Sequence, residues 1–252
     1  MPTKMLIFAI VLAATSSLLS GYLAFKVRPI YDQNDQCCDI PRFTNLYLSL
    51  KEAAGLSIFH SQIGQDKWVV YKVFPGVKDG YFVDVGSANG VNDSNSKVLE
   101  GLGWSGICID PFPTNMASRT CRVFKEVVDR KAGRRVRFRA SGYLGGIEEY
   151  LGKWKDAESV KQAQVVEFTT TTLADILERA KAPKFIHYVS IDIEGAELEA
   201  LRAFPFSKHK VGAFTIEHNS EEPKRTQINA LLESNGYWRV RATALDDFYI
   251  PR

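Results

Sequence analysis

Four acidic side chains stand where apolar runs end, and their types suit the binding of a polar ligand. Asp84 lies in FVDVGSANG, Asp110 ends GWSGICID, and Asp192 and Glu194 lie in SIDIEG. Each run reads as a buried strand that enters a turn. Because ligands of open α/β sheets bind outside the carboxyl ends of the strands, these carboxylates are expected to share one edge of a sheet.

The turn after Asp84 resembles a nucleotide-binding loop. Gly86 and Gly90 flank it, and the missing Cβ atoms let the backbone approach a ligand closely. Taken alone, this pattern fits a tight turn without a ligand equally well. The second acidic strand end, at Asp110, favours the ligand.

The aspartates after the second and third expected strands suit the two ends of a nucleoside. Asp110 follows Asp84 by about 26 positions, where a carboxylate can accept hydrogen bonds from ribose hydroxyls. A turn cap before Pro111 is the alternative, but order and spacing favour the ligand. Asp129 is expected near an adenine amino group.

The SIDIEG segment is expected on the reactive side of the site. Asp192 and Glu194 are candidates for the side of the site where the reaction takes place, because their strand should lie next to the first. Glu197 and Glu199, in contrast, suit the positive N-terminus of the following helix.

His218 is the candidate general base, because it follows an expected strand and an imidazole transfers protons near neutral pH. Glu217 and Asn219 could orient its ring. The alternative is an ordinary strand-end histidine bonded to a neighbour. A magnesium or manganese site from Asp192, Glu194 and His218 is conceivable, but no spacing demands one, and no metal is assigned.

The elements that would position these residues alternate along the chain. Strands are expected over residues 81–85, 106–110, 123–128, 186–193, 211–217, 237–242 and 247–250. Helices are expected over residues 66–74, 94–102, 172–182, 196–204 and 223–234. This alternation predicts a doubly wound α/β fold with a mainly parallel seven-stranded sheet. The short link between the last two strands predicts a C-terminal antiparallel hairpin, as in class I methyltransferases.

With these motifs in order, the chain resembles the FkbM family of methyltransferases over roughly residues 61–249. The matching segments are SQIGQD, GYFVDVGSANG, GWSGICIDP, TTLADIL, SIDIEGAELEALRAF, IEHN and DDFY. The resemblance implies O-methylation of a hydroxyl on a sugar or other small acceptor, with S-adenosyl-L-methionine as donor. It also implies that Asp84, Gly86, Ser87, Asn89 and Gly90 line the methionine part of the cofactor. Asp110 would then hold the ribose, and Asp192 and Glu194 would lie near the reacting methyl.

The N-terminal part reads differently from this domain. Residues 5–25 form an uncharged apolar run of about 21 residues, long enough for a transmembrane helix. A cleaved signal peptide is the alternative, and either would direct the protein to a membrane or to the secretory pathway. Residues 1–4 are then a short tail, 26–45 a stalk and 46–252 the methyltransferase domain. The flanking charges do not determine which side of the membrane the domain occupies.

The anchored form also resembles the Star protein group, which implies a non-catalytic alternative in cargo export from the endoplasmic reticulum. Cys37 and Cys38 in the stalk could be acylated, bridge another chain or stay unpaired. Four cysteines are too few for a disulfide scaffold. A net charge of +3 does not indicate nucleic acid as a partner, and no oligomeric state is indicated.

The segment after Asp129 is strongly basic. RKAGRRVRFR, residues 130–139, is expected to form a turn and a solvated edge strand, with binding of an acidic glycan or lipid headgroup as the alternative. The glycine-rich SGYLGGIEEYL that follows is expected to be a mobile loop over the acceptor.

Overall fold

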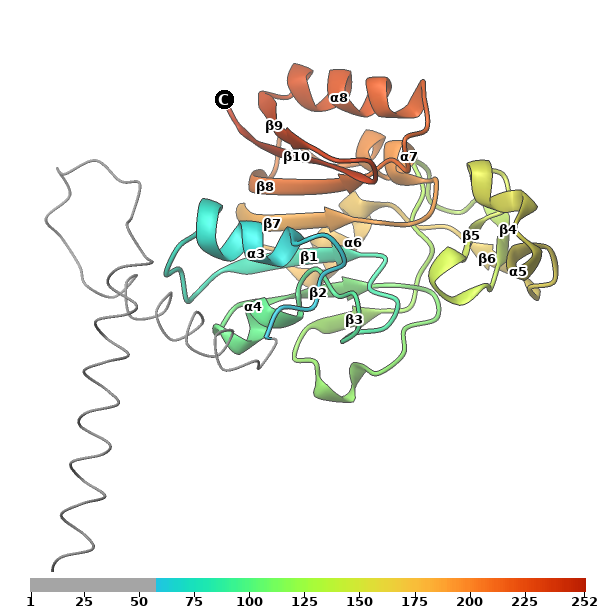
Figure 1. The fold of residues 1–252 in the computed structure, drawn as a ribbon, viewed down its shortest axis with the longest axis horizontal. Helices are drawn as coiled ribbons and strands as arrows, with labels where there is room; N and C mark the ends of the chain where they lie inside the picture. The colour runs from blue at the N-terminus through green and yellow to red at the C-terminus, as the bar shows by residue number, and fades with distance from the viewer. Residues whose placement is uncertain (1–57) are drawn as a thin grey trace, which may run out of the picture. The chain divides into compact units, whose positions relative to one another are not determined.

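The computed structural model describes residues 58–252 (Figure 1). The expected anchor, the stalk and residues 46–57 of the expected domain lie outside this part of the chain, as do Cys37 and Cys38. Among residues 58–252, no helix combines the length and the apolar character needed to cross a membrane.

A seven-stranded sheet forms the body of the domain, with the order β3-β2-β1-β7-β8-β10-β9 (Figure 1). The pairs from β3 to β8 are parallel, and β10 runs antiparallel to both β8 and β9. The strands are β1 (Tyr81–Val85), β2 (Ser105–Ile109), β3 (Arg122–Phe124), β7 (Phe185–Ile191), β8 (Lys210–Glu217), β9 (Tyr237–Ala242) and β10 (Asp246–Pro251). The mainly parallel α/β sheet and its C-terminal hairpin are confirmed, and the order is consistent with a methyltransferase fold.

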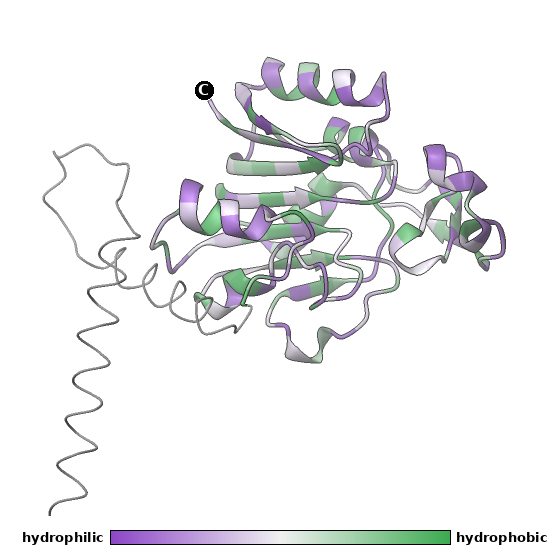
Figure 2. Ribbon diagram, in the orientation of Figure 1, coloured by the Kyte–Doolittle hydropathy of each residue, from purple (hydrophilic) through white to green (hydrophobic). Residues whose placement is uncertain are grey.

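The central strands form because their side chains are apolar on both faces, and Figure 2 shows hydrophobic residues along most of their length. Alternation along β1 directs Val83 and Val85 into one core and Phe82 into the other. Helices cover both faces, so both cores are removed from water.

The helices are short and alternate with the strands. They are α3 (Gln65–Trp68), continued by the π-helix η1 (Val69–Val73), α4 (Lys97–Gly101), α6 (Leu173–Ala180), α7 (Glu197–Arg202) and α8 (Lys224–Ser234). Thr172 begins α6 by accepting a hydrogen bond from the Asp175 amide at 3.1 Å. The expected helices are confirmed in type and order, although several are shorter than expected because their end residues belong to turns.

Residues 130–169 depart from the expectation. β4 (Arg135–Arg139) lies between β5 (Gly146–Ile147) and β6 (Val165–Thr169) in a second, three-stranded sheet. The edge-strand prediction for the basic run is therefore wrong. Val136 and Phe138 point into a small core while the arginines alternate outward, and Arg137 and Arg139 pair with Glu148.

The second sheet lies beyond the carboxyl ends of the parallel strands (Figure 1). In this sheet, the 3-10 turn η3 (Gly142–Leu144) links β4 to β5. The 3-10 turn η4 (Gly152–Asp156) and the helix α5 (Glu158–Lys161) link β5 to β6. Part of SGYLGGIEEYL thus forms η3 and β5. The third main strand also ends at Phe124, earlier than expected, and Val128 makes only an isolated bridge with Thr171.

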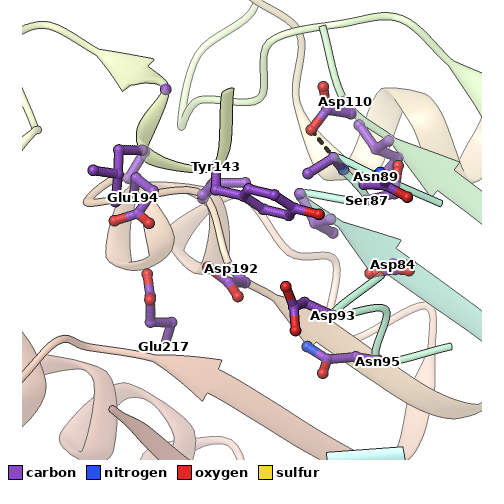
Figure 3. Close-up of a pocket in the computed structure, with 18 of the residues that line it drawn as sticks. Asp84, Ser87, Asn89, Asp93, Asn95, Asp110, Tyr143, Asp192, Glu194 and Glu217 are labelled. Atoms are coloured by element: carbon purple, nitrogen blue, oxygen red, sulfur yellow. Dashed lines mark hydrogen bonds between the residues drawn. The ribbon is translucent and has the colours of Figure 1, made fainter. Parts of the chain in front are cut away.

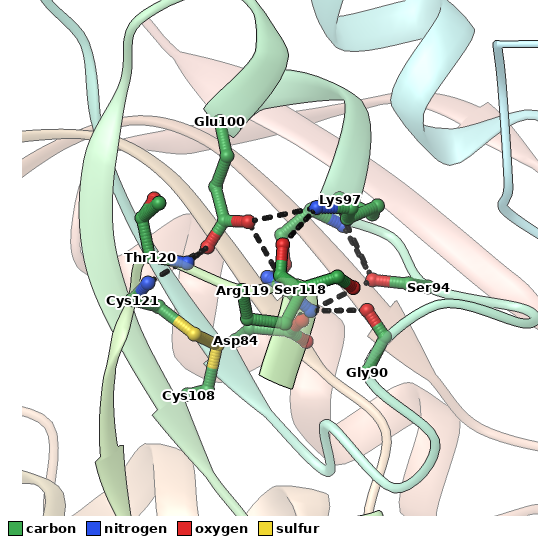
Figure 4. Close-up of a disulfide and its surroundings, with 11 residues drawn as sticks. Asp84, Gly90, Ser94, Lys97, Glu100, Cys108, Ser118, Arg119, Thr120 and Cys121 are labelled. Atoms are coloured by element: carbon green, nitrogen blue, oxygen red, sulfur yellow. Dashed lines mark hydrogen bonds and ion pairs between the residues drawn. A yellow bond between two sulfur atoms is a disulfide. The ribbon is translucent and has the colours of Figure 1, made fainter. Parts of the chain in front are cut away.

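A disulfide joins Cys108 in β2 to Cys121 just before β3 (Figure 4). Both cysteines are buried, and their Cα atoms are 5.9 Å apart. No sequence pattern indicated this pair, because thirteen positions separate the two cysteines and only the parallel pairing of β2 with β3 brings them together.

Candidate cofactor and active site

A cavity of about 410 Å³ opens at the carboxyl ends of β1, β2, β7 and β8 (Figure 3). Residues from distant parts of the chain meet there, as expected for the edge of an open α/β sheet. Of the ten residues expected in the site, those that line the cavity are Asp84, Gly86, Ser87, Asn89, Asp110, Asp192 and Glu194. The structure does not bring the other three, Gly90, Asp129 and His218, to the cavity lining.

The glycine loop is held tightly against the ends of β2 and β7. Gly86 has a φ of 90°, and a Cβ there would lie 1.6 Å from the carbonyl oxygen of Asp192. The amides of Gly86 and Ser87 both donate to the Ile109 carbonyl, at 2.8 and 3.2 Å. Only glycine fits at position 86, because both the backbone angle and the close strand exclude a side chain.

Gly90 serves packing rather than the cavity wall. A Cβ at this position would lie 2.7 Å from the sulfur of Met116, in the 3-10 turn η2 (Met116–Ser118). Its carbonyl accepts a hydrogen bond from Arg119 Nη1 at 2.8 Å. The second glycine of the loop therefore lets the following segment approach closely.

Asp110 is organised by the backbone around it. Its Oδ2 accepts the Ala88 amide at 2.9 Å, and its Oδ1 accepts the Phe112 amide at 2.7 Å. Burial raises the pKa of this carboxyl, although the two hydrogen bonds oppose the shift. The carboxylate closes the glycine loop onto the turn after β2 while its remaining lone pairs stay available to a ligand.

Asp84 lies deeper, at the base of the cavity, and belongs to a buried polar network. Its Oδ2 accepts a hydrogen bond from Ser96 Oγ, which also accepts from Arg119 Nη2 at 2.7 Å. Burial raises the pKa of Asp84, and the nearby Arg119 charge lowers it in part. The guanidinium thus stabilises the end of β1 from behind the cavity.

Arg119 was not singled out in the sequence, yet it connects most of this region (Figure 4). Its Nε donates to Glu100 Oε2 at 2.9 Å, and Nη1 donates to Gly90 and to Ser94 Oγ. Arg119 lies two residues before Cys121, so the disulfide tethers the segment that carries it. No local pattern distinguished it from the exposed arginines.

Asp129 occupies a different environment from the one predicted. It is fully buried, and its Oδ2 lies 2.6 Å from Arg134 Nε while its Oδ1 accepts the Arg130 amide. Both oxygens are engaged by the basic segment that follows. Glu126 and Val127, from the same stretch, line the cavity instead.

A second acidic group forms the opposite wall. Asp192, Glu194 and Glu217 each offer a carboxylate oxygen within 4.8 Å of the others. Burial and the neighbouring Glu197 raise the pKa of Glu194 to about 7, and burial together with adjacent carboxylates raises the pKa of Asp192 and Glu217. Glu217 was expected only to orient His218, but it is the residue of that pair that lines the cavity.

His218 does not project toward Asp192 as expected. Its Nδ1 accepts the Ser220 amide at 2.9 Å, and its Nε2 lies 3.5 Å from Asp247 Oδ1. The ring is 1% exposed, and it contacts β10 rather than the cavity. Side chains alternate along a strand, so the inward direction of Glu217 turns its neighbour away.

Asn219 and Glu197 complete the support of the acidic wall. Asn219 Nδ2 donates to Glu194 Oε2 at 3.2 Å. Glu197 Oε1 accepts the Ile193 and Gly195 amides at the start of α7, as expected for a carboxylate at a helix N-terminus. Lys224 pairs with the other oxygen of Glu197 at 2.9 Å.

A known protein family matches the part of the chain that forms most of this cavity. The model of the methyltransferase FkbM domain matches residues 84–238, which is more than half of the chain. The chain belongs to the FkbM methyltransferase family. It matches no curated protein. The FkbM match begins at Asp84 and includes both acidic walls of the cavity.

FkbM domains generally use S-adenosylmethionine, and the cavity has groups that fit it. Ser87 Oγ and Asn95 Oδ1 are buried, line the cavity and have no hydrogen-bond partner among residues 58–252. Such orphaned polar atoms are costly unless a ligand or water bonds to them. Asn95 was missed in the sequence because it lies in the loop before α4, where no strand pattern marks it.

Proposed function

We propose that the chain is an S-adenosylmethionine-dependent methyltransferase that methylates a hydroxyl group on a sugar or another small acceptor. The observation that supports this most is one cavity with two unlike walls. The glycine loop and Asp110 form the wall suited to a nucleoside, and the carboxylates of Asp192 and Glu194 form the other.

The cofactor, when bound, supplies a methyl group on a positively charged sulfur. Asp110 would hold the ribose hydroxyls, and the loop from Gly86 to Asn89 would hold the methionine part. Asp192 and Glu194 would orient the acceptor hydroxyl and favour loss of its proton as the oxygen reacts. With His218 turned toward Asp247, these two carboxyls carry the catalytic role in this proposal.

The cavity also has aromatic side chains. Tyr143 of η3 and Trp154 of η4 line it, and Trp154 Nε1 is buried without a partner in the described residues. Aromatic faces with a few polar groups suit the alternating apolar and hydroxyl surfaces of a sugar. The second sheet would thus supply acceptor specificity to the cofactor-binding fold.

The domain is further proposed to be anchored through residues 5–25 in a membrane of the secretory pathway or the plasma membrane, on the non-cytosolic side. The Cys108–Cys121 disulfide supports this side, because disulfides persist in oxidising compartments. Alkylation of free thiols in intact cells, followed by mass spectrometry, tests it. Alkylated Cys108 and Cys121 in native protein would contradict the assignment.

Binding and transfer can be tested in sequence on the full chain purified in detergent. Calorimetry with S-adenosylmethionine is expected to give one site, and exposed Asp156→Ala serves as the control for Asp110→Ala. Labelled donor with extracts of glycans, lipids and proteins then reveals the acceptor class. An ether formed on a hydroxyl survives mild alkali, whereas a methyl ester does not.

The Star-like trafficking role remains the competing hypothesis. No cofactor binding by folded protein would overturn the enzyme proposal and favour this alternative. Conversely, Asp192→Asn could abolish the function of the chain in cargo export while its folding and localisation are preserved. That result would count against a purely structural role.

A further inference from the structure

The wall formed by Asp192, Glu194 and Glu217 converges on one point. Asp192 and Glu194 follow β7, Glu217 ends β8, and Figure 3 shows the three carboxylates turned toward the same space. One oxygen from each lies within 4.8 Å of the others. Glu194 and Glu217 are 8% and 7% exposed, so water does little to screen their charges.

No cation of the described residues contacts this cluster directly, although the charges of Lys224 and Lys153 lower the pKa of Glu194 in part. Within residues 58–252, no lysine, arginine or histidine forms an ion pair with any of the three carboxylates. The two nearest lysines are engaged elsewhere: Lys224 with Glu197 and Glu221, and Lys153 with the Asn219 carbonyl.

The oxygen Oε2 of Glu217 gives a second, separate indication. This atom is buried, belongs to a residue that lines the cavity and has no hydrogen-bond partner among the described residues. The hydrogen bond between the carboxyls of Asp192 and Glu217 stays within the cluster and brings no positive charge to it. Glu194 receives one donor, the Asn219 amide, and still has free lone pairs. A carboxylate oxygen buried without a partner costs free energy unless a cation or a donor meets it.

We propose that Asp192, Glu194 and Glu217 form a binding site for one hard divalent cation such as Mg²⁺, Mn²⁺ or Ca²⁺. An all-oxygen donor set selects these ions over softer metals. Three oxygens spaced evenly around one ion lie at most about 3.6 Å apart at the roughly 2.1 Å distance of magnesium, and at most about 4.3 Å apart at the roughly 2.5 Å distance of calcium. The three carboxylate oxygens, which lie within 4.8 Å of one another, would contract least around calcium.

The site differs from the one that the sequence alone made conceivable. There the third ligand was His218; here it is Glu217, because the alternation of β8 exchanges the two. Binding of the cation stands on the carboxylates alone. Its use, to hold the acceptor oxygen beside the methyl donor, rests on the proposed function.

The test uses the full chain in detergent, stripped of metal with chelator and titrated with Mn²⁺, whose free form is followed by electron paramagnetic resonance. Mg²⁺ and Ca²⁺ are added as competitors. Glu217→Gln and Glu194→Gln each remove one ligand charge, and Glu178→Gln, at an exposed glutamate of α6, is the matched control. Circular dichroism melts establish that each variant is folded.

We expect one Mn²⁺ per wild-type chain, competition by Mg²⁺ or Ca²⁺, and affinity at least about tenfold weaker in both ligand variants. The control should bind like wild type. No binding up to about 1 mM Mn²⁺, the weak end of protein sites, would overturn the proposal, as would unchanged binding in folded Glu217→Gln.

Experiments with the cofactor distinguish failure of the cation site from failure of the proposed function. If S-adenosylmethionine and Mn²⁺ exclude each other, the two compete for the cluster, and the use of the cation beside the methyl donor is refuted while its binding stands. If Mn²⁺ binds but no methyl transfer is detected, the cation site is upheld and only the proposed function fails.

Discussion

The two acidic walls of the cavity differ in how the protein meets their charge. On the side of the glycine loop, Asp110 accepts two backbone amides and Asp84 lies in the network of Arg119. On the side of β7 and β8, Glu217 has an oxygen with no partner in the described residues. The protein supplies donors to the carboxylates of the first wall, whereas no cation of the described residues forms an ion pair with those of the second.

This difference separates carboxylates that stabilise the fold from carboxylates that reduce its stability. Carboxylates with their own donors stabilise the loop in the shape that a nucleoside needs. Carboxylates that repel one another reduce stability, and proteins keep such groups where they act on something else. Substitutions on the two walls are therefore expected to change the free energy of unfolding in opposite directions.

The largest effect is expected from Arg119→Ala. It leaves Glu100 buried without its guanidinium and removes donors to Gly90, Ser94 and Ser96, which should lower the free energy of unfolding by about 3–5 kcal/mol. Urea denaturation followed by circular dichroism measures it. Arg202→Ala, at an arginine that is 41% exposed, should cost less than about 1 kcal/mol. Equal losses in both variants would contradict the role given to Arg119.

Asp247 extends the comparison to a buried carboxylate whose charge is met by cationic side chains of the protein. Burial opposes its ionisation, but the 3.5 Å contact with His218 Nε2 and the hydrogen bonds from Arg225 and Arg239 prevail and hold its pKa well below the usual range. Its contribution to stability is therefore present above pH 3.8 and is lost as the pH falls below that value. Asp247→Asn should lower the free energy of unfolding at pH 7 by about 2–3 kcal/mol and weaken its dependence on acid. An unchanged acid-unfolding curve would refute this.

Asp110→Ala is expected to act on binding more than on folding. Loss of a charged acceptor for ribose hydroxyls and of the loop contacts is worth about 1.5–3 kcal/mol, or roughly ten- to hundredfold in affinity for S-adenosylmethionine. Calorimetry gives the affinity, and a thermal melt gives the fold. Wild-type affinity in the variant would show that Asp110 supports only its turn.

Glu217→Gln should have the smallest effect and the opposite sign. In chelator, a neutral amide relieves crowding with Asp192 and Glu194 and can donate a hydrogen bond, so stability should rise by up to about 1 kcal/mol. Differential scanning calorimetry measures the change. A clear loss of stability would mean that the Glu217 carboxyl is already satisfied within the protein.

Local patterns were sufficient for most of the elements and for one wall of the site. The apolar run of β1 followed by Gly86 predicted a strand and a close turn, and both are present. The short link before β10 predicted the hairpin, because a parallel crossover needs more residues. In both cases, neighbours in the chain determine the geometry.

Where prediction failed, the deciding contact depended on how a later segment folds, and no local pattern marked it. Asp129 was placed by region alone, and the sequence did not indicate that Arg134 would fold back onto it. β4 read as an edge strand because basic side chains are typical of solvated sheet edges, but β5 and β6 pair with its two sides. Cys108 and Cys121 carried no signal until β2 and β3 paired.

Hydrophobic patterns and motifs predicted an α/β sheet of the methyltransferase type, a glycine loop at the end of its first strand and acidic residues at neighbouring strand ends. These follow from hydrophobic period and from backbone sterics, which act over a few residues. That Glu217 rather than His218 lines the cavity, with one oxygen left without a hydrogen-bond partner among the described residues, is evident only in the folded domain. The direction of a side chain at a strand end, and the burial that makes its charge costly, depend on everything packed around it.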